Sequence, residues 1–307
     1  MRNTRALQGG ALLALLALGF GVSPLLYGNQ SLLFSMMAYV ALAQGLNVAY
    51  GFTGYLPFGY VGFFGAGAYG TALAITALHW PPVAAVLGGG VLAMVFGVVL
   101  APLLRLSGAY FSIANLAASQ ALYYVVANPD LAGITRGPYG IKLTSVFAPN
   151  LSYAVLWVIL LLATGAAIYL RTSRLGLALR ATNQDPVSAA AAGVDPVRGR
   201  LVAWLLSALI AGLVGGAYGW HVSVFYPQSV FTLRISIFAI VFVLFGGAGT
   251  VIGPVIGAVL LYGLYDAIGI SSPEYFQLVY GILIIALVLF LPDGLASLAR
   301  RRVRDVL

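Results

Sequence analysis

The chain has 307 residues, of which 62% are hydrophobic and only 7% are charged, and its formal net charge is +8. Its mean hydropathy is +1.01. A water-soluble domain carries roughly 25% charged residues, so the composition excludes a soluble protein and predicts an integral membrane protein. The sequence has no cysteine, which excludes disulfides and thiolate metal sites, and His79 and His221 are too far apart in sequence to form a metal cluster unaided.

The N-terminal stretch imitates a signal peptide, because Arg2 and Arg5 precede an apolar run over residues 6–20. Residues 22–25 make a poor cleavage site, so we interpret the stretch as an uncleaved first span. Apolar runs bounded by glycine, proline and charge predict about ten transmembrane helices in all, since one span needs roughly 20 residues. The predicted spans lie near residues 7–27, 32–50, 58–79, 82–103, 108–127, 151–170, 201–220, 234–248, 251–268 and 276–292.

The predicted fold class is therefore an all-α polytopic membrane protein that forms a single domain over residues 1–307. Eight spans with a buried hairpin are an open alternative to ten. The eighth predicted span is short, and residues 52–70 are so rich in glycine that a broken or re-entrant helix is an alternative there.

The basic residues predict the orientation. With the N-terminus inside and ten crossings, the outer segments hold only Arg136, Lys142 and Arg234. The inner segments hold all the others: Arg2, Arg5, Arg105, Arg171, Arg174, Arg180, Arg198, Arg200, Arg300, Arg301, Arg302 and Arg304. Because cytoplasmic segments carry the excess of basic residues, we expect a multi-pass protein of the inner or plasma membrane with both termini in the cytoplasm.

The longest predicted cytoplasmic loop, about residues 171–200, contains a short helix with complete end signals. Asp185 suits the N-cap, Pro186 the first helical position and Gly193 a left-handed C-terminal cap. The residues between them favour a helix: Val187, Ser188, Ala189, Ala190, Ala191 and Ala192. This helix is too short to cross a membrane, so it needs another explanation.

The chain shows no energy source of its own. It has no phosphate-binding loop of the G-x-x-x-x-G-K-[ST] type, and Lys142 is its only lysine. Of its seven acidic residues only Asp266 falls within a predicted span, towards the outer end, whereas ion-coupled transporters keep ionisable groups near the midplane. His221 has no evident carboxylate partner in sequence and is interpreted as structural. We therefore expect no catalytic residue, no cofactor and no metal.

Two sets of residues within the spans could matter for the pore or for packing. The mildly polar residues Gln44, Asn47, Asn115, Ser119 and Gln120 could line a pathway or form interhelical hydrogen bonds, and the sequence leaves both readings open. Small residues at every fourth position predict close helix packing: Ala208, Gly212 and Gly216 in one row, and Gly249, Gly253 and Gly257 on one face of another helix.

Taken together, these motifs resemble one known family, the membrane permease subunit of branched-chain amino acid ABC importers of the LivM type. The similarity runs from about residue 40 to residue 300, and the order and spacing of its pieces are more specific than any piece alone. They are Leu46-Asn47, Gly51, Gly54, Gly59, FFGAGAY at 63–69, YFSIANLA at 110–117, GPYGI at 137–141, SRLG at 173–176, residues 180–181, 189–193 and 207–212, FGGAGT at 245–250, residues 257–258 and LPDGL at 291–295.

The resemblance implies a function for the short cytoplasmic helix. In this family such a helix looks like the coupling helix that docks onto the cytoplasmic ATPase, so residues 185–193 are expected to couple ATP hydrolysis to the pore. The implied partners are a homologous permease, two cytoplasmic ATP-binding subunits and an extracytoplasmic solute-binding protein, together with membrane lipid and without nucleic acid. Departures at Pro57, Tyr60, Gln120, Arg136 and Tyr139 leave the solute open among branched-chain amino acids and similar small polar solutes.

Two rival functions stay open at this stage. A secondary transporter or facilitator would move a small solute without ATPase partners and should show ligands for a coupling ion. A membrane scaffold or enzyme would have no transport role. Purification with neighbouring subunits separates the importer from both rivals, because only the importer requires an ATPase.

Overall fold

The computed structural model describes residues 2–271 together with residues 278, 281–282, 285 and 294–295. Within this part the chain is mainly helical. The long helices are α1 (Arg2–Leu26), α2 (Gln30–Thr53), α3 (Val61–Thr76), α4 (Pro82–Val99), α5 (Gly108–Val126), α7 (Pro149–Thr172), α10 (Pro196–Val222), α12 (Leu233–Gly246) and α13 (Ile252–Ser271). Shorter elements are α6 (Ala132–Thr135), α8 (Arg174–Gln184), α9 (Pro186–Ala191), α11 (Pro227–Val230) and 3-10 turns at Ala101–Arg105, Pro129–Leu131, Gly137–Tyr139 and Thr144–Val146.

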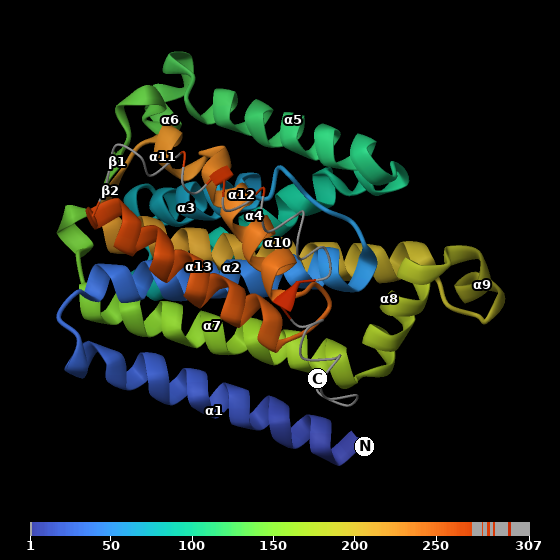
Figure 1. Cartoon of the computed structure of the whole chain (residues 1–307). Coiled ribbons are helices and arrows are strands. Elements are labelled where there is room, and N and C mark those ends of the chain that lie inside the picture. Colours follow the sequence, from blue (N-terminus) through green and yellow to red (C-terminus); the bar gives the residue numbers. More distant parts are fainter. Residues whose placement is uncertain (1, 272–277, 279–280, 283–284, 286–293, 296–307) are drawn as a thin grey trace.

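Most of the long helices lie side by side in one bundle with two distinct ends (Figure 1). At the end that we call the ribbon end, the strand β1 (Ile141–Lys142) pairs antiparallel with β2 (Val224–Phe225), beside α6 and α11. At the opposite end, the α9 end, α8 and α9 extend beyond the bundle, and the chain begins at this same end with α1. The predicted coupling loop and the start of the chain are therefore on one side of the bundle.

The helices are long and apolar enough for a membrane protein. Five of them qualify as spans by length and composition: α2, α4, α7, α10 and the continuous stretch Pro227–Gly246 that contains α12. Shorter apolar helices lie at Gly9–Pro24, Val61–Thr76 and Ile252–Ile268. An all-α membrane protein is thus confirmed, whereas the count of ten spans stays a prediction, and most of the predicted tenth span, 276–292, lies outside the described residues.

Two of the helices are shorter than the hydrocarbon core of a membrane. α3 has 16 residues and α12 has 14, so they are about 24 and 21 Å long, against roughly 30 Å of hydrocarbon. The backbone from residue 54 to residue 60, before α3, and from residue 247 to residue 251, after α12, is not in an α-helix. Backbone groups outside regular helices need other hydrogen-bond partners wherever water does not reach them, so polar side chains are expected beside these two segments.

Small residues bring the central helices into backbone contact. A Cβ atom added to Gly67 of α3 would lie 2.0 Å from the carbonyl oxygen of Gly212 on α10, and one added to Gly216 would lie 2.3 Å from the hydroxyl of Thr71. On α13, a Cβ on Gly257 would lie 2.1 Å from the Phe242 carbonyl oxygen of α12. Larger residues at these positions would separate the helices.

The prediction that Gly249, Gly253 and Gly257 share one helix face is wrong for Gly249. α13 begins at Ile252, so Gly253 and Gly257 lie in the helix but Gly249 precedes it. Gly249 has a φ of +75°, which is a left-handed conformation that glycine adopts without steric cost. This residue therefore shapes the turn before α13 instead of packing along the helix.

Candidate functional site

The predicted short helix is present as α9, and its end signals act as expected. The Asp185 carboxylate accepts a hydrogen bond from the Val187 N–H at 2.9 Å and one from the Ser188 hydroxyl. The Ser188 hydrogen bond, followed by those of the backbone N–H groups of Val187 and Ser188, holds the pKa of Asp185 below its usual value, so the cap is ionised at neutral pH. Gly193 ends the helix with a φ of +85°.

α9 is displayed at the surface of the α9 end (Figure 1). Of residues 185–193 only Ala189 is buried, and the side chain of Val187 is 77% exposed. Exposed small and apolar residues on a capped helix are suited to contact with another protein. The nearby ion pair between Arg198 and Asp195, with N–O distance 3.0 Å, is largely exposed and contributes little to stability.

α8 anchors this exposed helix to the bundle. Leu179 of α8 is buried in a small cluster with Val48, Phe52, Leu170 and Ala203, which belong to α2, α7 and α10. A Cβ on Gly176 would lie 1.5 Å from the Leu170 carbonyl oxygen, so α8 crosses the end of α7 in direct backbone contact. α8 is therefore packed against three long helices of the bundle.

A hydrogen-bonded turn lies where α2 and α7 approach the loop between α12 and α13. We call residues 247–251 the glycine turn. Asn47 of α2 forms two hydrogen bonds with this turn. Its Nδ2 donates to the Thr250 carbonyl at 2.6 Å, and its Oδ1 accepts from the Gly249 N–H at 2.8 Å. Gln44 donates to the Val251 carbonyl at 2.7 Å. The side chains of Gln44 and Asn47 are fully buried, and their bonds supply partners to the buried backbone of Thr250 and Val251 and to the partly buried Gly249.

Arg171 links the glycine turn to α8. Its Nη1 donates to the Gly249 carbonyl at 3.1 Å, while its own carbonyl oxygen accepts from Arg180 of α8 at 3.3 Å. Arg180 also donates to the Gly176 carbonyl at 3.2 Å. A continuous set of contacts thus runs from α8, through the end of α7, to the turn that joins α12 and α13.

The polar residues of α5 belong to a different place. Asn115 is buried and its Oδ1 accepts from the Gly59 N–H at 2.7 Å, which satisfies the irregular segment before α3. A Cβ on Gly62 would lie 2.9 Å from the Ser119 hydroxyl oxygen, so α3 and α5 are in close contact there. Gln120 is half-buried. The structure therefore divides the five predicted polar residues between the glycine turn and α5. The side chains of Gln44, Asn47 and Asn115 form hydrogen bonds with the backbone of other segments. That any of the five residues lines the pathway stays a prediction.

A cavity of about 490 Å³ lies beside α9. Pro186 of α9 lines it together with residues of the irregular segment before α3 and of the start of α5, among them Tyr55, Phe58 and Ser112. Arg200 of α10 also lines it and lies over the Tyr55 ring, 4.9 Å from the ring centroid. α9 and the irregular backbone before α3 thus line one cavity.

His221 has structural contacts. Its Nδ1 lies 2.8 Å from the Ser152 hydroxyl of α7, and its ring stacks on Phe34 of α2 with a centroid distance of 3.7 Å. Among the described residues there is no group of three or more histidine, cysteine or acidic side chains that could hold a metal ion.

Sequence reasoning missed a cavity near the ribbon end that contains Arg234. The pattern of basic residues places Arg234 only among the outer positive charges. The residues that line the cavity come from α2, α3, α10, α11, α12 and α13. The only local signal was a pair of tyrosines, Tyr262 and Tyr265, at helical spacing and next to Asp266.

Comparison with known proteins gives a consistent result. Residues 30–288 match a family described as "Branched-chain amino acid transport system / permease component". The chain is 28% identical over 305 residues to the high-affinity branched-chain amino acid transport system permease protein LivM of Escherichia coli, covering 87% of this chain and 70% of that protein. It is 27% identical over 286 residues to LivH of the same organism, covering 84% and 90%, and 29% identical over 214 residues to a probable LivH of Methanocaldococcus jannaschii, covering 67% and 63%. No solved structure matches the chain.

Proposed function

Because the chain belongs to the permease-component family of branched-chain amino acid ABC transport systems, we propose that it forms, with a second and homologous permease, the pathway of an ATP-driven importer. Two cytoplasmic ATP-binding subunits supply the energy, and an extracytoplasmic binding protein delivers the solute. The chain itself contributes no ATPase site. A secondary transporter is not favoured, since the relatives are permease components of this transport system.

The observation that carries the proposal is the exposed, capped helix α9 with its connection to the bundle. α9 docks into an ATP-binding subunit, which places the α9 end and the start of the chain in the cytoplasm and the ribbon end outside. Displacement of α9 moves α8, and the Arg180–Arg171–Gly249 contacts pass the movement to the glycine turn. The turn then shifts α12 and α13 relative to α2, and this change opens the pathway to one side of the membrane at a time.

The transported solutes are branched-chain amino acids. The relatives LivM and LivH are permease proteins of high-affinity branched-chain amino acid transport systems, which supports this assignment. The apolar and mildly polar character of the bundle suits an aliphatic amino acid better than a highly charged solute.

The experiment is purification of the chain with its neighbouring subunits, followed by reconstitution with the binding protein in proteoliposomes. We expect ATP-binding subunits to co-purify and labelled leucine to accumulate only when ATP is supplied on the α9 side. Leucine uptake without an ATP-binding subunit would contradict the importer. Uptake of another solute in place of leucine would contradict the substrate assignment alone.

A further inference from the structure

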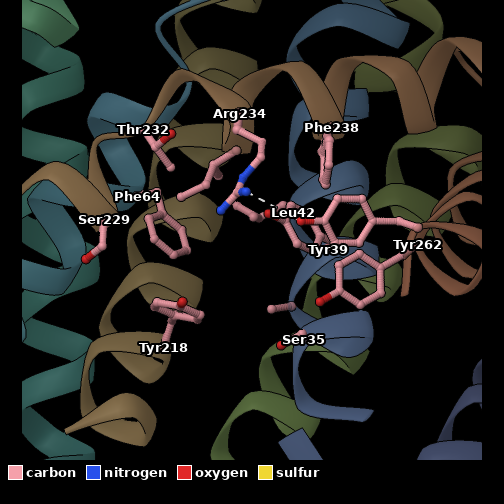
Figure 2. A pocket seen from close by; sticks show the side chains of 13 residues that line it. Ser35, Tyr39, Leu42, Phe64, Tyr218, Ser229, Thr232, Arg234, Phe238 and Tyr262 are labelled. Carbon is pink, nitrogen blue, oxygen red and sulfur yellow. Dashed lines mark hydrogen bonds between the residues drawn. The ribbon is translucent and has the colours of Figure 1, made fainter. Parts of the chain in front are cut away.

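A cavity of about 120 Å³ lies between α2, α3, α10, α12 and α13, towards the ribbon end. This volume is several times the roughly 30 Å³ that one water occupies in the liquid, so it can hold a small solute. Figure 2 shows Arg234 at its rim, with its guanidinium group directed towards the space that Tyr39, Tyr218 and Tyr262 surround. Phe64 and Phe238 add apolar wall.

Arg234 is an available cation. It is the second residue of α12, and its recorded hydrogen bond to a described residue is a long one of 3.4 Å from Nη1 to the Tyr265 hydroxyl. In the described part of the chain the ion pair within 4.0 Å is the one between Arg198 and Asp195, at the opposite end. A guanidinium group has five N–H donors in a fork that matches a carboxylate, so Arg234 keeps most of its donors for a ligand.

The surroundings of Arg234 favour an anion with an apolar body. The first turn of α12 presents the positive end of a helix dipole beside the guanidinium group. Tyr39 and Tyr218 line the same cavity as Arg234. Leu42, Ile235 and the phenylalanine rings offer apolar contact, and tyrosine ring faces attract a cationic group such as an ammonium.

Arg234 is exposed and lines the cavity, so its guanidinium group is accessible to a solute that enters there. We propose that this cavity is a transient binding site of the translocation pathway, in which Arg234 holds the carboxylate of an amino acid and the aromatic wall holds its ammonium group and aliphatic side chain. The assignment of an amino acid as the ligand rests on the function proposed above. The carboxylate contact itself rests on the cavity and on Arg234.

The absence of cysteine from the chain makes a direct test available. Thr232 lines the cavity and makes no side-chain cap hydrogen bond, so Thr232→Cys introduces a single reporter thiol. Ser145→Cys, exposed in the turn Thr144–Val146 at the same end, is the control. The rate of labelling by a water-soluble maleimide is measured on the assembled permease complex without binding protein, with increasing leucine or leucinamide, which lacks the carboxylate.

We expect leucine to slow labelling at Thr232→Cys and not at Ser145→Cys, and leucinamide to protect much less. Adding Arg234→Gln should raise the half-protecting leucine concentration about 10- to 100-fold, because a charge-assisted hydrogen bond contributes roughly that factor. Arg234→Lys should fall between, since lysine keeps the charge but not the fork. Lys142→Gln, which removes another charge from the same end, should leave protection unchanged.

Two results would overturn the proposal: equal protection by leucinamide and leucine in the parent protein, or an unchanged half-protecting concentration in Arg234→Gln. The first comparison needs no arginine variant, so it holds even if Arg234→Gln fails to assemble. If the complex imports leucine but leucine does not protect Thr232→Cys, the cavity proposal fails and the importer stands. If leucine protects but is not imported, the substrate assignment fails and the carboxylate site stands.

Discussion

Replacing Ala191 with proline tests whether the shape of α9 transmits the energy of ATP hydrolysis. α9 runs only from Pro186 to Ala191, so a proline at its end removes a helical N–H and its ring meets the carbonyl one turn earlier. The cost in a helix interior is about 3 kcal/mol or more, which is a shift of roughly 100-fold in the helical equilibrium, at 1.4 kcal/mol per tenfold. Only one residue of α9, Ala189, is buried, so packing offers little compensation.

The assay is ATP-dependent leucine uptake by proteoliposomes that contain the whole complex, with binding of the ATP-binding subunits measured alongside. We expect Ala191→Pro to reach normal membrane levels but to lose uptake, with the ATPase bound weakly or hydrolysing ATP without transport. Ala191→Gly is the matched control, because glycine costs only about 1 kcal/mol in a helix and should give a partial loss. Normal uptake by Ala191→Pro at equal protein levels would refute the coupling role of α9.

Three further changes test the cap, the glycine turn and helix packing. Asp185→Ala removes the carboxylate that accepts from Val187 and Ser188, so uptake should fall less than in Ala191→Pro in the same assay. Asn47→Leu leaves the buried Thr250 carbonyl without its partner, which costs about 1–3 kcal/mol, and it also removes the partner of the partly buried Gly249 N–H. The purified complex should therefore unfold at a lower temperature, and an unchanged midpoint would show that other contacts hold the turn. Gly253→Leu places a Cβ 2.5 Å from the Gly246 carbonyl oxygen, so it should reduce the yield of assembled complex in size exclusion. Gly281→Leu is the control and should assemble normally, because a Cβ at Gly281 meets nothing within 4 Å among the described residues.

Sequence alone determined the features that depend on short stretches of chain. The scarcity of charge established the membrane class, and apolar runs placed the helices because each run must exclude water over its own length. The α9 helix was predicted with its caps, since Asp185, Pro186 and Gly193 act on backbone groups only a few residues away. Glycine at positions 212 and 216 indicated close packing, although not which helix would be packed.

Tertiary structure decided which polar groups meet. Hydropathy indicated that Asn47 lies in a span, but its partners in the glycine turn are 202 and 203 residues away in the chain. Gln44 and Asn115 likewise satisfy backbone of other segments, and the sequence could not separate that role from pore lining. The pocket of Arg234 needs tyrosines from α2, α10 and α13. A contact between such distant segments depends on how each helix is rotated and how closely it packs, and a sequence in which every face of a helix is apolar carries no periodic signal that specifies that rotation.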